Sequence, residues 1–308
     1  MTSGSLYFKL LKEDFRRRLW AIALVFLAFF FTLPIGLALN MENAANTNYY
    51  RYNDYEPFIQ DAAMTDLQYK TRLLELKTEV VLNGVEYGNG MIAFLMITAA
   101  VVIGVSSFAY LHNKKKVDFY HSIPVRREAL FGAQFSGGIF IVGAAYGFNL
   151  LLLTGVALSY GVPVGRILGA MAGGWALNML YYALMYTTAV AAMMMTGNIV
   201  VGVLGTGVFF FFLPGIMMLL GWYCETFFVT TARYMWSSVQ SPFTWGVKYL
   251  SPFSVYINSF GWKMNELAKH VPELICTVLA FLAVTTLDLE LYRRRPSEAA
   301  GKAMAFKK

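Results

Sequence analysis

Charged residues are scarce in this sequence. Asp, Glu, Lys and Arg make up 14% of the 308 residues, whereas a soluble domain is roughly one-quarter charged. From Ile167 to Cys224 not one of them occurs. A soluble fold needs a charged surface that this stretch cannot supply, and the stretch is long enough for two membrane-spanning helices of about 20 residues each. The apolar runs are continuous rather than alternating, which favours helices over the strands of a barrel.

Cysteine and histidine are also rare, and this disfavours most enzyme classes. The two cysteines, Cys224 and Cys276, have no metal-binding or redox spacing, and His112, His121 and His270 are far apart in the sequence. The chain contains no zinc-protease motif, no G-x-S-x-G elbow and no G-x-x-x-x-G-K-[ST] phosphate-binding loop. We therefore expect no catalytic residue, no metal site and no cofactor. If ATP drives this protein, a partner subunit must hydrolyse it.

The apolar runs predict an all-α integral membrane protein with a single transmembrane domain, residues 1–308. The first run is too long for a signal-peptide core, so we interpret it as a membrane span, with a kink at Pro34. Two long connections are predicted to be extracellular, 40–89 with a helix near 58–83, and 222–270 with short helices broken at Pro242 and Pro252 that cap the exit. Six spans are expected, at about 20–39, 90–111, 130–159, 167–195, 199–221 and 271–291.

The distribution of positive charge predicts that both termini are cytoplasmic. With the N-terminus inside, the inner segments carry 16 of the 25 Lys and Arg residues, and the longer outer segments carry nine. Cytoplasmic loops of membrane proteins are enriched in these residues. The net charge of +7 is explained in this way, so we expect contact with the lipid bilayer and none with nucleic acid.

An amphipathic helix is predicted before the first span, over residues 5–19. Tyr7, Phe8, Leu11, Phe15 and Leu19 recur at helical spacing, opposite four basic residues. Such a helix lies on the membrane surface. A plain basic cap on the first span is the alternative.

Ionisable side chains are nearly absent from the predicted spans. Asp288 and Glu290, beside the three arginines Arg293–Arg295, are expected to be interfacial. Because such side chains commonly form proton relays, their absence disfavours a proton-driven carrier or pump.

Small residues in the spans predict close helix packing. Gly137 and Gly138 lie in the third span, and Gly169 and Gly173 form a G-x-x-x-G pattern in the fourth. Packing within the chain and contact with a second subunit both remain open from the sequence.

The segment between the second and third spans, Phe108–Phe131, is the most informative. A short cytoplasmic helix is predicted over Lys114–Ser122, and Pro124 suits the first turn of the third span. The short helix contains apolar residues that a solvated loop does not need, so they favour docking onto a protein. Aromatic side chains at the lipid headgroups explain the residues equally well.

The sequence Lys114-Lys-Lys-Val-Asp-Phe-Tyr-His-Ser-Ile-Pro124, followed by Arg127-Glu and Phe131, resembles a segment of bacterial permease subunits of ATP-binding-cassette transporters of the type-2 exporter class. Ile123 stands where that class has leucine, and Tyr249–Phe253 is also similar to sequence in the class. The resemblance implies a coupling helix that sits in a groove of the ATPase subunit. It assigns this contact to Val117, Asp118, Phe119, Tyr120, His121, Ser122 and Pro124.

These features predict the transmembrane subunit of an ATP-driven exporter in the bacterial cell membrane, paired with a second permease subunit and with separate ATPases. Its charge-free interior favours an amphipathic or apolar substrate, such as a peptide antibiotic or a lipid-like molecule. Two alternatives are a membrane sensor that binds a ligand through 40–89 and an ion-driven secondary carrier.

Overall fold

A computed structural model describes residues 3–42, 66–122, 125–228, 242–262 and 264–306. Within these residues the chain is almost entirely helical, and its only β pairing is one isolated bridge, between Thr196 and Met304. Six helices are long and apolar enough to cross a membrane. The protein is thus a multi-pass helical membrane protein, as its composition predicts.

The six predicted spans are confirmed as helices, with small shifts at their ends. Pro34 lies in a π-helical turn, η1, where the regular hydrogen-bonding pattern of the first span changes. The fifth span extends six residues beyond its predicted end. The helices are α2 (Leu19–Phe30) continued by η1 (Phe31–Ile35) and residues up to Glu42, α5 (Gly90–Phe108), α7 (Arg127–Ser159), α8 (Val164–Met195), α9 (Ile199–Phe227) and α13 (Val271–Arg294).

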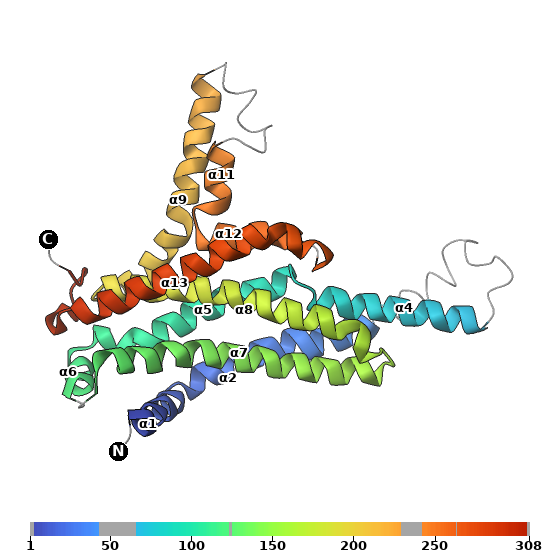
Figure 1. Ribbon diagram of the computed structural model, residues 1–308, viewed down its shortest axis with the longest axis horizontal. Helices are drawn as coiled ribbons and strands as arrows, with labels where there is room; N and C mark the ends of the chain where they lie inside the picture. The colour runs from blue at the N-terminus through green and yellow to red at the C-terminus, as the bar shows by residue number, and fades with distance from the viewer. Residues whose placement is uncertain (1–2, 43–65, 123–124, 229–241, 263, 307–308) are drawn as a thin grey trace.

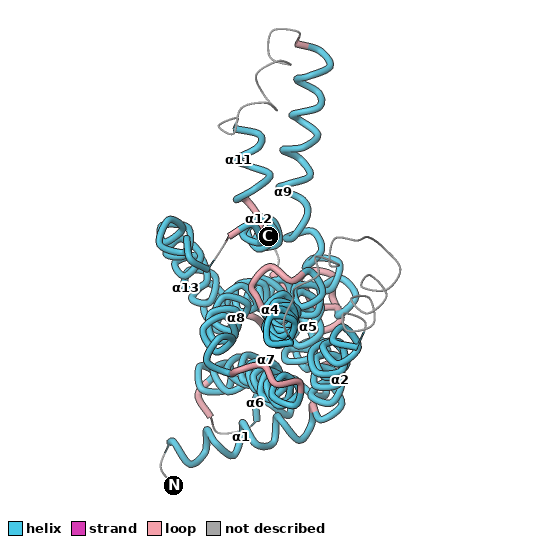
Figure 2. Tube along the Cα trace, turned by 90° about the vertical axis from the view of Figure 1, so that its right-hand side faces the viewer, coloured by secondary structure: helices cyan, strands magenta, loops and turns pink. Residues whose placement is uncertain are grey.

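Helix α8 is the centre of the bundle. It packs against α5, α7, α9 and α13, and Figures 1 and 2 show α5, α7 and α13 running alongside it, whereas α9 projects away. Every residue from Tyr181 to Met194 is buried. This helix is the least hydrophobic of the six spans, and its polar side chains, among them Asn178 and Tyr182, have hydrogen-bond partners inside the bundle that lipid does not offer.

Helix α9 leaves the bundle. Figure 1 shows it projecting sideways with α11 (Pro242–Tyr249) along it, and α12 (Pro252–Asn258) returning to the bundle. The prediction of short helices in this connection is confirmed within the described residues, and the two prolines are the first residues of α11 and α12. Whether these helices cap an exit stays a prediction. Much of the apolar surface of α9 is exposed, including Leu204, Phe212 and Leu219.

Helix α4 (Asp66–Val85) extends beyond the bundle at the opposite end from α6 (Figure 1). The predicted helix near 58–83 is confirmed from Asp66 onward, and its earlier part lies outside the described residues. A turn with Gly88 at φ +97° leads into α5, whose first amides at Met91 and Ile92 donate to the Asn89 side chain (3.0 and 3.3 Å). This capping separates α4 from α5.

A polar and aromatic cluster fixes α12 near the α4 end of α8. The hydroxyl of Tyr256 donates to Asn178 Oδ1 (2.6 Å), and Asn178 Nδ2 donates to the hydroxyl of Tyr146 (3.2 Å). The ring of Tyr256 also stacks on Tyr181 at 5.1 Å. Because these buried polar atoms satisfy one another, α12 can lie among apolar helices.

The chain after α13 folds back onto the turn between α8 and α9. The amide of Gly301 donates to the carbonyl of Gly197 (2.8 Å), and that of Ala305 donates to the carbonyl of Met195 (2.9 Å). Residues 196–198 form the tight turn between α8 and α9. Gly197 is needed for close approach, because a β-carbon there would overlap the carbonyls of Ala299 and Lys302.

Close packing inside the bundle can be tested at Gly138. A β-carbon there would lie 2.6 Å from Cζ of the buried Tyr186, whereas a β-carbon at Gly169 would meet open space. We expect Gly138→Ala to destabilise the protein by about 1–3 kcal/mol through overpacking. Gly169→Ala is the matched control and should leave the midpoint of thermal unfolding in detergent unchanged or higher. Equal midpoints for the two variants would contradict the packing described.

Candidate functional site at the α6 end of the bundle

The short helix α6 (Lys114–Ser122) has the bounds that the sequence predicts. It connects η2 (Ala109–His112), which ends the second span, to α7. Helix α7, however, begins at Arg127, because Arg126 is in extended conformation (ψ 136°). The expectation that the third span begins near Pro124 is therefore wrong by three residues; Pro124 itself lies outside the described residues.

The two faces of α6 have different surroundings. Val117 is buried, with 2% of its surface exposed, whereas Phe119 is 55% exposed. Lys114–Lys116, Asp118 and Ser122 are also exposed. Val117 cannot reach a partner while α6 stays in place, so the docking contact expected of it is not supported. The side chain of His121 lies outside what the structure describes.

Tyr120 attaches α6 to the rest of the protein. Its ring lies 4.3 Å from that of Tyr110 in η2, and the Tyr110 hydroxyl bonds to the hydroxyl of Tyr292 in α13 (2.8 Å). Arg17, the last residue of α1 (Ser3–Arg17), donates from Nη1 to the Tyr120 hydroxyl (2.6 Å). Tyr120 therefore connects α6 to α1, η2 and α13.

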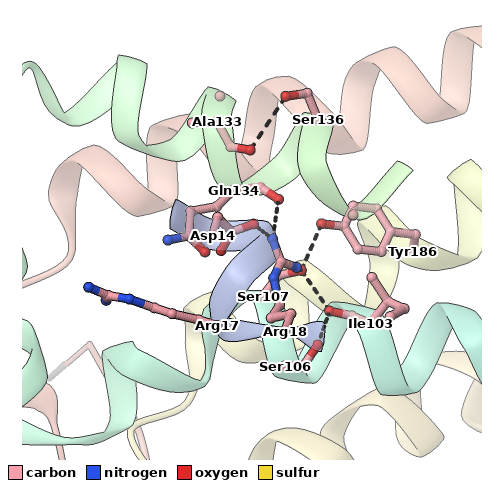
Figure 3. A network of polar contacts seen from close by, with 12 residues as sticks. Asp14, Arg17, Arg18, Ile103, Ser106, Ser107, Ala133, Gln134, Ser136 and Tyr186 are labelled. Atoms are coloured by element: carbon pink, nitrogen blue, oxygen red, sulfur yellow. Dashed lines mark hydrogen bonds and ion pairs between the residues drawn. The ribbon is translucent and has the colours of Figure 1, made fainter. Parts of the chain in front are cut away.

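The residue after Arg17 is the centre of a buried polar network (Figure 3). Arg18 forms an ion pair with Asp14 and donates to the hydroxyl of Ser107 in α5. Tyr186 of α8 donates to the same hydroxyl (3.2 Å). With its amide nitrogen turned toward them, Gln134 of α7 donates to Asp14 Oδ1 (3.2 Å) and to the carbonyl of Ser107 (2.6 Å). One arginine thus connects the end of α1 to three spans.

The buried pair of Asp14 and Arg18 was not predicted. The side-chain exposures are 8% and 5%, and burial lowers the pKa of Arg18. The signal lies in the spacing: Leu11, Asp14 and Arg18 share one helical face with Tyr7, whose hydroxyl bonds to Ser136 of α7 (2.7 Å). The predicted amphipathic helix is confirmed as a helix, but its inward face also contains charge.

The three arginines after α13 have separate roles. Arg295 is buried and donates from Nη1 to the carbonyls of Met193 and Met194 (2.7 Å each), so it caps the C-terminal end of α8. Burial lowers the pKa of Arg295 to about 10, and the guanidinium remains protonated at neutral pH. Arg293 forms an ion pair with Glu128 of α7 (2.5 Å). Arg293 and Arg295, whose positive charge indicates the orientation in the membrane, therefore also hold α13 to α7 and to the end of α8.

Asp288 differs from its predicted place at the interface. Its side chain is completely buried (0% exposed), and neither carboxyl oxygen has a hydrogen-bond partner among the described residues. Glu290, in contrast, is partly exposed and pairs with Arg294 (2.6 Å). The expectation that Asp288 lies at the interface is wrong, because its side chain is on the buried face of α13, together with Tyr292.

Comparisons with protein-family models, with curated proteins and with solved structures gave no match. In the described part of the chain no group of three His, Cys, Asp or Glu side chains gathers as a metal site would require. Helix α6 and its attachments are therefore the features of the described residues that bear on function.

The Asp14–Arg18 pair can be tested by removing one partner and then both. Arg18→Met leaves a carboxylate buried without its partner, and we expect a loss of about 3–5 kcal/mol in the free energy of unfolding. In Asp14→Asn/Arg18→Met no unpaired charge remains, so this variant should be more stable than Arg18→Met. The exposed pair of Arg294 and Glu290 is the control, and Arg294→Met should change the free energy of unfolding much less than Arg18→Met, because water and salt screen an exposed pair. If the double variant is less stable than Arg18→Met, the pair does not act as described.

Proposed function

We propose that this chain is the transmembrane subunit of an ATP-driven exporter and that a separate ATPase subunit binds α6. The observation that carries the proposal is that α6 is exposed on one side and attached on the other. Asp118, Phe119 and Ser122 are accessible to a partner, whereas Val117 and Tyr120 hold the helix to the bundle. The resemblance of this segment to coupling helices of type-2 exporters supports the same assignment.

The attachments of α6 provide a route for movement. Force on α6 reaches α5 and α7 directly along the chain. It also passes through Tyr120 to Arg17, and the next residue, Arg18, contacts Ser107 and Gln134. Packed side chains and rigid helices of this kind transmit displacement between sites when they have two stable arrangements. In this proposal, ATP-driven closure of the ATPases moves α6 and reopens the bundle on the opposite side.

The orientation of the chain in the membrane follows from the need for the ATPase, and hence α6, to be in the cytoplasm, where ATP is available. The α6 end is cytoplasmic in this proposal, and Figure 1 shows both termini near that end. The exposed apolar faces of α9 and α13 need covering by lipid or by a second permease subunit. The few charged side chains of the spans favour an amphipathic or apolar substrate, such as a peptide antibiotic or a lipid-like molecule. The resemblance to bacterial permease subunits supports a location in the bacterial cell membrane.

The proposal is tested by isolating the chain from its native membrane under mild conditions. We expect an ATP-hydrolysing subunit to co-purify, and Phe119→Ala to weaken its affinity for the chain by roughly thirtyfold or more, because an aromatic anchor at an interface commonly contributes about 2 kcal/mol or more. Phe94→Ala removes an equally exposed phenylalanine from α5 and is the control. Recovery of the chain without any ATPase would count against the proposal.

Asp288 favours a second candidate, an ion-driven carrier. A buried carboxyl group without a partner in a spanning helix is typical of proton pathways. Proton entry into ATP-free vesicles, reported by a pH-sensitive dye, separates the two functions. For an ATP-driven exporter, Asp288→Asn and wild-type vesicles should show the same proton flux, and the variant should be at least as stable, since it removes an unpaired buried acid. A flux that is lost in Asp288→Asn and retained in Glu290→Gln favours the carrier.

A further inference from the structure

A cavity of about 580 Å³ lies between α1, the end of α5 with η2, and α6. Four basic side chains line it, Arg17, Arg18, Lys115 and Lys116, against one carboxylate, Asp14. Arg18 pairs with Asp14, and Arg17 pairs with Glu13 (3.2 Å). Within the described residues no carboxylate lies within 4 Å of either lysine ammonium, so the lysine charge is uncompensated and attracts an anion.

The cavity also provides one neutral hydrogen-bond donor. The hydroxyl of Tyr120, which lines it, accepts from Arg17 and still has its own proton to donate, whereas the lining residues Ser106 and Ser107 already donate to the carbonyl of Ile103 (3.1 and 2.7 Å). A phosphate group has several acceptor oxygens and negative charge, and it binds ammonium groups and hydroxyls together. A carboxylate has only two acceptor oxygens for the ammonium groups and the hydroxyl that line the cavity, whereas a phosphate has more. The lining therefore matches a phosphate better than a small carboxylate.

The position of the cavity relates it to the membrane surface. Trp20, 57% exposed, lines the cavity at the start of the first span, and Ser107 and Tyr110 lie where the second span ends. Tryptophan at the end of a span marks the headgroup level of a bilayer. An adjoining cavity of about 210 Å³ is also lined by Asp14 and Arg17, but most of its accessible surface is apolar and includes Leu10 and Leu130. A basic site beside this largely apolar surface suits a molecule with a phosphate and a hydrocarbon part.

We propose that this cavity binds the phosphate headgroup of an anionic phospholipid of the adjacent leaflet. Lys115 and Lys116 neutralise the phosphate, and the apolar neighbouring cavity takes the start of an acyl chain. Basic pockets between the ends of spanning helices bind anionic headgroups through the same interactions. The site needs only this chain and a bilayer, so it stands whether or not α6 binds an ATPase.

The test uses the full chain purified in detergent, incubated with equal amounts of phosphatidylglycerol and phosphatidylcholine and analysed by native mass spectrometry. We expect the wild type to retain phosphatidylglycerol preferentially. Lys115→Gln/Lys116→Gln should reduce that preference by roughly tenfold or more, since each basic residue near an anionic headgroup contributes to binding. Lys114→Gln/Arg126→Gln is the matched control, because it removes the same charge from exposed positions that do not line the cavity.

Three results would overturn the proposal. One is that the wild type shows no preference between the two lipids. Another is that both double variants lose the preference equally, which would indicate general surface charge. The third is that inorganic phosphate alone raises the thermal unfolding midpoint as much as phosphatidylglycerol does, with the effect lost in Lys115→Gln/Lys116→Gln, which would identify a soluble phosphate as the ligand. Thermal unfolding of both variants also checks that they are folded.

Discussion

The ion pair between Asp14 and Arg18 is the constraint on which this end of the structure depends. Two charges removed from water need each other and further polar partners, because an isolated buried charge is strongly destabilising. Ser107 and Gln134 supply those partners from α5 and α7. The need to satisfy one arginine therefore decides where α1 ends and which spans meet there.

The neighbouring residue extends the same constraint outward. Arg17 contacts Tyr120, so the end of α1 is joined to α6 as well as to the bundle. The two adjacent arginines thus have different surroundings. The side chain of Arg18 is buried, whereas that of Arg17 is exposed at the surface. Helix α6 is attached through a few contacts, chiefly those of Tyr120 with Arg17 and Tyr110. In the proposed transporter, a displacement of α6 would therefore be transmitted to α5 and α7.

The large side chains of α8 require a close fit from the helices that pack around it. Its buried half contains three large tyrosines, Tyr181, Tyr182 and Tyr186, and helix packing around them requires small residues opposite. Gly138 meets the ring of Tyr186 directly. In lipid, helices gain little from burying apolar surface, so close fit and internal hydrogen bonds have a larger share in holding them together.

Composition and apolar run length determined the class of this protein, the six spanning helices and the existence of α6, because the bilayer requires long apolar helices and a turn must interrupt them. Pro242 and Pro252 also predicted that the connection after the fifth span is broken into short helices. Only the tertiary structure decided which polar residues face inward. Asp14, Arg18, Asp288 and Arg295 have the same local signature as charges at a membrane surface, yet all four are buried. Burial depends on which helices pack together, and that arrangement is set by contacts between residues far apart in the chain.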